Sequence, residues 1–320
     1  MKLLKLVPDN TNIDFMKVRN IALVISIILT VASLSLVAIK GLNLGIDFVG
    51  GQVVRATFAQ PINIEDLRGR MNALDVGEAS IQDFGDNRTY QVRLPSPPDA
   101  KASAEIVGKV RTALQNQYPG VKVGAGEAVS GKVSEELARD GALALGLAML
   151  GIAIYIWFRF EWQFGVGALV TLFHDVSMIL GFFAVTRLQF DLNVVAAFLT
   201  VVGYSLNDTV VIYDRIRENL RKYRKMQIIP MLNLTLNETL SRTIVTSLSI
   251  MLALTMLLIF GPEVIFGLTA AILLGTFVGT YSSIYISAPI LVWLGVRPDS
   301  FLKAEDKAPA KLAGGDGAVV

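Results

Sequence analysis

Residues 194–213 read VVAAFLTVVGYSLNDTVVIY, an apolar run that carries the polar pair Asn207-Asp208 in its second half. About 20 mainly apolar residues are enough for a helix to cross the hydrocarbon core of a bilayer. A charged side chain at the centre of a bilayer costs about 2.5–3.5 kcal/mol on insertion scales. This stretch therefore predicts a membrane-spanning helix with a candidate functional residue, Asp208, inside it.

The composition of the whole chain is typical of a membrane protein. Of the 320 residues, 53% are hydrophobic and 18% are charged, and the mean hydropathy is +0.54. The net charge of +2 is too small to indicate a nucleic-acid partner, and the sequence has no G-x-x-x-x-G-K-[ST] motif for ATP. The chain has no cysteine and one histidine, His174, which excludes disulfides and a multi-histidine zinc site.

Six runs have the length and composition of membrane spans. The first could be mistaken for a signal peptide, but its 19 residues exceed the usual apolar segment and no small-residue cleavage site follows. We interpret it as a retained signal anchor, and spans two to six fall within 139–296. The six predicted spans are 21–39, 141–158, 164–186, 194–213, 243–260 and 265–294.

Lysine and arginine residues in the short connections predict the orientation, because they favour the cytoplasmic side. They are concentrated in the N-terminal arm, 1–20, and in the basic loop 214–241, whereas the opposite short connections contain only Arg187. The first part of that loop, 214–230, is expected to be a basic helical extension of the fourth span. Both termini are therefore expected in the cytoplasm and residues 40–138 outside it. The tail, 297–320, is rich in Ala, Gly, Lys and Asp and is expected to be disordered.

Residues 40–138 lack long apolar runs and show the patterns of a small soluble domain. A strand at 45–58 with a Gly-Gly break precedes an amphipathic helix at 63–74. Two short strands, a second helix at 99–118 and a last strand at 121–129 complete a β-α-β-β-α-β order. This order is typical of the ferredoxin-like α+β fold, inserted here between spans one and two of an α-helical integral membrane protein.

Asp208 is the strongest functional candidate in the spans. It lies about 8 Å inside the end of its span, at a helical rise of about 1.5 Å per residue from Tyr213. From that depth its side chain is too short to reach the interface. Tyr204 lies on the same helix face and Asn207 adjoins the carboxylate. Asn207 either shares the functional role of Asp208 or only fixes the orientation of the Asp208 carboxylate.

Arg242, at the start of the fifth span, is a candidate partner of Asp208. It is either an ordinary anchor at the cytoplasmic surface or a cation that reaches inward to pair with Asp208. Arginine stays protonated, so it supplies a fixed positive charge. An intramembrane carboxylate beside a cation is suited to the use of a proton gradient, with protons as the coupling ion and no cofactor.

Two further features of the spans have both a functional and a structural interpretation. His174 and Asp175, in the third span, form either a proton relay or a buried polar contact between helices. The sixth span has a small residue at every fourth position, including Gly275 and Gly279. Such spacing predicts a face on which another helix packs closely.

Four motifs carry a resemblance to a known family: GYSLNDTVVIYDRIREN (203–219), SRTIVTS (241–247), GIDFVGG (45–51) and YIWFRFEW (155–162). They resemble the SecF family, the smaller membrane subunits of the SecD–SecF complex of the bacterial Sec translocase. The resemblance extends from residue 13 to the sixth span. In that family the aspartate of the ND pair and the arginine of the RT pair, here Asp208 and Arg242, are linked to proton conduction.

The resemblance implies a six-span half bundle of the RND superfamily in the bacterial inner membrane, completed by a SecD-like subunit in a heterodimer. It implies that the complex uses the proton-motive force to assist late steps of protein export through SecYEG. The further partners it implies are YajC, the translocating secretory polypeptide and membrane lipids. No enzymatic activity is expected.

Two other functions remain open from the residues alone. One is half of an RND-type exporter of small molecules or lipids, which would normally contain a second half and a second insert. The other is a non-conducting scaffold of the translocon, in which Asp208 is a structural hydrogen-bond acceptor.

Overall fold

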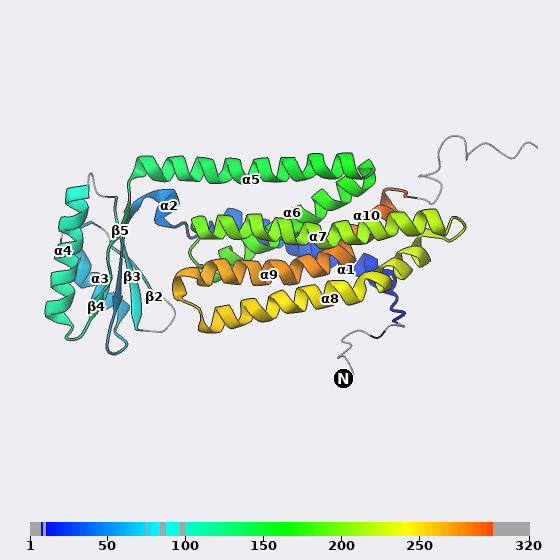
Figure 1. Ribbon diagram of the computed structural model, residues 1–320. Helices are drawn as coiled ribbons and strands as arrows, with labels where there is room; N and C mark the ends of the chain where they lie inside the picture. The colour runs from blue at the N-terminus through cyan, green and yellow to red at the C-terminus, as the bar shows by residue number, and fades with distance from the viewer. Residues whose placement is uncertain are drawn as a thin grey trace, which may run out of the picture.

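The computed structural model describes residues 8, 11–74, 76–77, 79–83, 88–96 and 100–296; the predicted tail, 297–320, and part of the N-terminal arm lie outside them. Six of the described helices are long and apolar enough to cross a membrane, which confirms the six predicted spans. They form one bundle with a small α+β domain at one end (Figure 1). The spanning helices are α1 (Arg19–Lys40, preceded by the 3-10 turn η1, Phe15–Val18), α5 (Gly131–Arg159), α6 (Trp162–Thr186), α7 (Leu192–Lys222), α8 (Ile228–Phe260) and α9 (Phe266–Ser282).

Helices α6, α7 and α9 form the inside of the bundle. Their apolar side chains pack in two clusters, one around Phe164 and Tyr213 and the other around Phe183 and Phe198. In contrast, α5 along most of its length and α8 from Val245 onward lie outside and expose large apolar side chains. Such exposure is unfavourable in water, whereas in a bilayer these side chains face lipid. The bundle is therefore built for a membrane.

The last span is not a uniform α-helix. After Ser282 the chain forms a π-helical turn, η3 (Ser283–Ser287), and then α10 (Ala288–Trp293). Pro289 lies in the first turn of α10 and has no backbone N–H to donate, so regular α-helical bonding is interrupted there. The turn places the buried hydroxyl of Ser283 against Thr209 of α7, whereas the hydroxyl of Ser287 donates to the carbonyl of Ser283.

Within the basic segment 214–241, residues 214–222 continue α7, in agreement with the expected helical extension, and residues 228–241 belong to α8. Only the five residues 223–227 lie between α7 and α8. Ion pairs stabilise the helices beyond their apolar stretches: Arg215 pairs with Glu218 of its own helix (2.6 Å) and with Glu238 of α8 (2.7 Å). The end of an apolar run marks the end of the membrane-embedded part of a helix, and here the helix continues past it.

The α+β domain has a sheet with the predicted β-α-β-β-α-β order, except that the last strand is divided. All pairings in the sheet are antiparallel, in the order β2-β3-β1-β4, and β5 also pairs with β1. Its elements are the short helix α2 (Ile46–Val49), β1 (Gly51–Thr57), α3 (Ile64–Asn72), β2 (Ser80–Asp83), β3 (Thr89–Leu94), α4 (Ala100–Gln117), β4 (Lys122–Val123) and β5 (Glu127–Val129).

The last strand is divided because one residue bulges out of its pairing with β1. Ala56 of β1 pairs with Val123, and Val53, three residues earlier, pairs with Glu127, four residues later. The extra residue lies in the stretch GAG between the two pairs. Two glycines make such a β-bulge easy to form, and a simple strand pattern in the sequence does not reveal it.

The two faces of the sheet have different roles. Helices α3 and α4 cover the face turned away from the bundle and enclose the core of the domain, which includes Val54, Leu67, Met71, Val92 and Leu114. The other face is polar and is bound to the connection between α6 and α7. Gln91 of β3 donates to Gln189 (2.8 Å), and Arg93 donates to the carbonyl of Leu44 (2.8 Å). These bonds attach the domain to the bundle (Figure 1).

Candidate functional site

Asp208 lies in the interior of the bundle, where α7 meets α8. It is buried, and its carboxylate lies against the hydroxyl of Ser247 on α8. That hydroxyl also accepts a hydrogen bond from Tyr204 (3.3 Å) and bonds with Thr280 of α9 (2.7 Å). Among the described residues, Oδ2 of Asp208 has no hydrogen-bond partner. A buried carboxylate oxygen in this state can take up a proton or a water molecule.

Arg242 is exposed on α8 and acts electrostatically on Asp208. Within the described part of the chain, however, no ion pair joins the two side chains. Arg242 instead lines a cavity of about 440 Å³ between α5, α7 and α8. Val211, which also lines this cavity, lies one helical turn from Asp208. The cavity therefore lies within about one helical turn of Asp208, which is not itself among its lining residues.

Asn207 does not share the buried environment of Asp208. It is exposed on the outer face of α7, and no hydrogen bond to its side chain is found among the residues that the structure describes. Thr200 and Gly203 are exposed on the same helix. These three positions form a weakly apolar stripe on α7, in contrast to the apolar outer surfaces of α5 and α8.

Asp175 is the second buried carboxylate of the bundle, and it joins three helices. Its Oδ2 accepts hydrogen bonds from Ser205 of α7 (2.5 Å) and Ser282 of α9 (2.9 Å). Its Oδ1 lies 2.9 Å from Nδ1 of His174, which donates to it. In contrast to Asp208, both oxygens of Asp175 are engaged.

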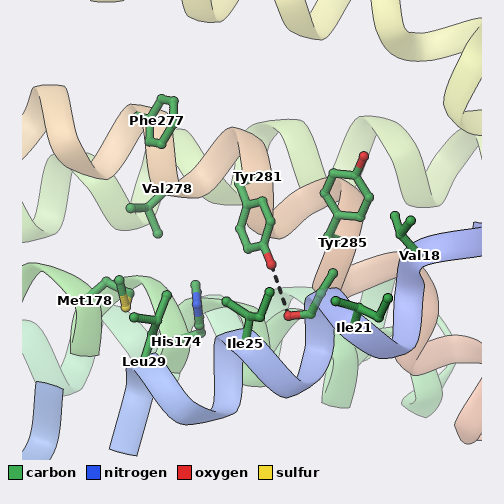
Figure 2. A pocket seen from close by; sticks show the side chains of 11 residues that line it. Val18, Ile21, Ile25, Leu29, His174, Met178, Phe277, Val278, Tyr281 and Tyr285 are labelled. Atoms are coloured by element: carbon green, nitrogen blue, oxygen red, sulfur yellow. Dashed lines mark hydrogen bonds between the residues drawn. The ribbon is translucent and has the colours of Figure 1, made fainter. Parts of the chain in front are cut away.

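His174 lies between this polar centre and an apolar cavity of about 430 Å³. The cavity lies between α1, α6 and α9, and Figure 2 shows His174 beside Met178 with Ile25 and Leu29 of α1 in front of it. Nε2 of His174 is buried and has no hydrogen-bond partner among the described residues. In the tautomer in which Nδ1 donates to Asp175, Nε2 is an acceptor.

Gly275 and Gly279 lie where α9 approaches α7 most closely. A Cβ atom at Gly279 would lie 3.1 Å from Cβ of Ser205, and one at Gly275 would overlap the side chain of Val201. The same face carries a row of polar contacts one turn further on, where Thr209 bonds with Ser283 (3.2 Å). Close approach of the two backbones allows these short side chains to meet.

Sequence reasoning missed the hydroxyl partners of these carboxylates. No pattern in the sequence assigns Ser205, Ser247, Thr280 or Ser282 to a site. Serine and threonine are common on packing faces, so only the tertiary contacts distinguish these four residues. Among the described residues, no group of three or more His, Asp or Glu side chains is arranged to hold a metal ion.

Comparison with known proteins gives the family. The family model described as "Protein export membrane protein SecD/SecF, C-terminal" matches residues 109–297, and the SecD/SecF GG motif matches residues 35–62. Protein translocase subunit SecF of Cereibacter sphaeroides is 43% identical over 92% of this chain and 93% of that protein. The chain belongs to the SecF family. SecF of Pseudomonas aeruginosa is 42% identical and covers 92% of this chain and 95% of its own.

A solved structure related to this SecF-family chain shows the same architecture. The crystal structure of SecDF, a translocon-associated membrane protein from Thermus thermophilus, superposes with a TM-score of 0.82 at 33% identity. The match covers 90% of this chain and 39% of the SecDF chain. This SecF-family chain therefore corresponds to about two fifths of that polypeptide.

The SecF GG motif connects α1 to the sheet through two glycines with positive φ. Gly50 has φ +71° and Gly51 has φ +126°, and a Cβ atom at Gly51 would lie 2.8 Å from the carbonyl oxygen of Leu94. The two glycines are thus required for the turn from α2 into β1. Just before them, Gly45 donates its N–H to the carbonyl of Phe190 (2.7 Å) in the connection between α6 and α7.

The N-terminus of α7 in this SecF-family bundle is held by two carboxylates. Asp191 accepts the N–H of Val194 (3.1 Å) as the N-cap, and Asp47 of the GG motif accepts the N–H of Leu192 (3.0 Å). Burial raises the pKa of the Asp191 carboxyl above its ordinary value, and the nearby negative charge of Asp47 raises the pKa further. The helix that carries Asp208 is therefore bonded directly to the segment that enters the α+β domain.

Proposed function

We propose that this SecF-family chain, together with a SecD-like partner, uses the proton-motive force to assist late steps of protein export through the SecYEG translocon. The proposal rests on one observation. A buried carboxylate, Asp208, has an unpartnered oxygen and lies one helical turn from Val211, in the wall of a cavity that Arg242 also lines. Protons are the coupling ion, and the chain acts as a transport component without enzymatic activity.

Proton uptake at Asp208 changes the charge of the bundle interior. The ionised carboxylate is opposed by burial and favoured by Arg242, so a small change in water access or in the distance to Arg242 changes its protonation. The membrane potential supplies about 2.3 kcal/mol per charge for each 100 mV. That free energy is enough to bias two conformations by more than about tenfold.

The proposed partner covers the outer stripe of α7. Thr200, Gly203 and Asn207 are exposed at the depth of the bilayer, where an amide without a partner is unfavourable against lipid. A second six-span half packed on this stripe would give Asn207 a hydrogen-bond partner and would enclose Asp208. The related SecDF polypeptide is long enough to contain such a half besides the part that matches this chain.

The link from α7 to the α+β domain supports a mechanical role. Movement of α7 on protonation of Asp208 is transmitted through the bonds of Asp47 and Gly45 to the segment that leads into β1. We place the domain on the extracytoplasmic side and both termini in the cytoplasm of a bacterium, with the chain in the inner membrane. There the domain can act on a secretory polypeptide that leaves the translocon.

The substitution Asp208→Asn tests the proposal. The isosteric amide keeps the packing but cannot exchange a proton, so we expect assembly with the SecD-like partner to persist. Proton-dependent stimulation of export into membrane vesicles should be lost. Asp140→Asn is the matched control, because Asp140 is an exposed carboxylate of α5. If Asp208→Asn leaves the stimulation intact, the relay is wrong and the non-conducting scaffold is favoured.

A further inference from the structure

A second polar cavity lies at the end of the bundle away from the α+β domain, where α5 ends and α7 emerges. Its volume is about 490 Å³, and it opens to the outside beside α7. We call it the basic pocket. It is lined by Arg159, Asp214, Arg217, Glu218, Arg221 and Lys222.

The carboxylates of the basic pocket are already neutralised. Asp214 pairs with Arg159 (3.0 Å) and Glu218 with Arg215, which lies outside the pocket (2.6 Å). Arg217 also has a counter-ion beyond the pocket, Glu161 at 3.1 Å. Arg159, Asp214, Arg217 and Glu218 therefore each have an oppositely charged partner.

Two cations of the basic pocket remain uncompensated. Within the described residues, neither Arg221 nor Lys222 forms an ion pair with a carboxylate. Nε of Arg217 is buried and has no hydrogen-bond partner there either. The pocket thus offers two cations without a carboxylate ion-pair partner, Arg221 and Lys222, of which Nζ of Lys222 lies 5.0 Å from the ring centroid of Tyr223. Two such cations suit a phosphate group.

An apolar surface adjoins the pocket along α5. Directly before Arg159, the side chains of Trp157 and Phe158 are 68% and 87% exposed, and Ile154 is 48% exposed one turn earlier. Exposed tryptophan and phenylalanine beside arginine are typical of the level at which acyl chains meet headgroups. The acyl chains of a lipid can pack on this apolar surface, whereas a free anion makes no favourable contact with it.

The position along α7 agrees with the headgroup layer. The apolar stretch of α7 ends at Tyr213, and Lys222 lies about 13 Å further along the helix. The interfacial region of a bilayer is about 5–8 Å thick on each side. The pocket therefore begins where the hydrocarbon ends and continues past the headgroups, from where the long side chains of Arg221 and Lys222 can reach back to a phosphate.

We propose that the basic pocket binds the phosphate headgroup of an anionic phospholipid, with the acyl chains along the exposed side chains of α5. An anionic lipid is selected over a zwitterionic one because a choline or ethanolamine group would bring a positive charge next to Arg221 and Lys222. This site is separate from the proton path proposed for Asp208 and does not depend on it.

The test is native mass spectrometry of the full chain in detergent, with phosphatidylglycerol and phosphatidylcholine of identical acyl chains. The pocket variant is Arg221→Gln with Lys222→Gln. The matched control is Arg224→Gln with Lys225→Gln, which removes the same charge from exposed neighbours outside the pocket lining. We expect the pocket variant to lose about thirtyfold in affinity for phosphatidylglycerol and the control to lose much less.

Three outcomes would overturn the proposal. Equal losses in the two variants would show attraction by general surface charge, and no loss in either would show that the pocket is not a lipid site. Full competition by glycerol 1-phosphate at the concentration of the lipid would indicate a free-anion site. Because no proton gradient is present in this measurement, its result is independent of the outcome for Asp208→Asn.

Discussion

The carboxylate of Asp47 accepts the backbone N–H of Leu192 at 3.0 Å, so the GG motif of the family caps the first residue of α7 from outside that helix. The two residues are separated by 145 positions in sequence. The bond belongs to a set that also includes a short parallel bridge between Leu44 and Phe190. The entrance to the α+β domain and the start of α7 are thus one structural unit.

Removal of the Asp47 side chain should loosen this unit. A hydrogen bond to a charged group contributes about 1.5 kcal/mol or more, so Asp47→Ala is expected to accelerate amide exchange at Leu192 by about tenfold. Hydrogen exchange followed by mass spectrometry measures this. Asp47→Asn keeps an acceptor oxygen and should show a smaller change. Equal exchange in wild type and Asp47→Ala would mean that the contact does not hold α7.

Asp191 should make the stability depend on pH. Its pKa is raised in the folded protein, so the folded state binds more protons than the unfolded state between the unfolded value near 3.8 and the folded value. Stability contributed by the protonated group is therefore complete below that window and is lost as pH rises through it. Asp191→Asn keeps an N-cap and removes this loss.

We accordingly expect Asp191→Asn to raise the thermal midpoint relative to wild type at neutral pH, with little difference at about pH 3.5, near the lower edge of that window. Thermal scans of the detergent-solubilised chain at several pH values measure the difference. A difference in thermal midpoint between wild type and Asp191→Asn that stays constant over the pH range would contradict the expectation.

The hydroxyls around Asp175 should contribute to stability. Ser282→Ala removes one of the donors to a buried carboxylate, at a cost of about 1–3 kcal/mol in the free energy of unfolding. Unfolding in mixed micelles measures this cost. Ser249→Ala is the control, because Ser249 bonds within its own exposed helix face. An equal loss of unfolding free energy in Ser249→Ala would show that the bond from Ser282 to Asp175 makes no particular contribution to stability.

Gly279 should tolerate no larger side chain. In Gly279→Val the added atoms press on Ser205, which separates α7 from α9 and costs about 1–3 kcal/mol. The same substitution at Gly146 of α5 meets nothing within 4 Å and serves as the control. The thermal midpoints of Gly279→Val and Gly146→Val are compared, and we expect the lower value for Gly279→Val. A similar midpoint for both would mean that the α7–α9 contact adapts.

The spans and the order of elements in the α+β domain could be predicted because each depends on local pattern. A run of twenty apolar residues, or apolar residues at helical spacing, can be recognised without knowing which other elements pack against it. The division of the last strand could not be predicted, since it depends on a one-residue shift in its pairing with β1. The pairing of Arg215 with Glu238 of α8 likewise joins residues of two helices, and no local pattern reveals it.

The candidate site was predictable in its residues but not in its arrangement. A carboxylate in an apolar run is visible in the sequence, so Asp208 and Asp175 could both be selected. Their environments differ because Ser205 and Ser282 meet at Asp175, whereas Asp208 keeps an unpartnered oxygen. The sequence also left open whether Arg242 pairs with Asp208, and its place in a cavity wall comes from the packing of α5 and α8.

The 31 residues of α7 form a single rod of about 46 Å, with no proline inside it. Its first residue is tied to the GG motif by Asp47, and its last two residues, Arg221 and Lys222, stand in the basic pocket. A force on the α+β domain and a force at the opposite membrane surface thus act on the same continuous helix. Asp208, the proposed proton-binding group, lies about midway along it, between the two ends on which these forces act.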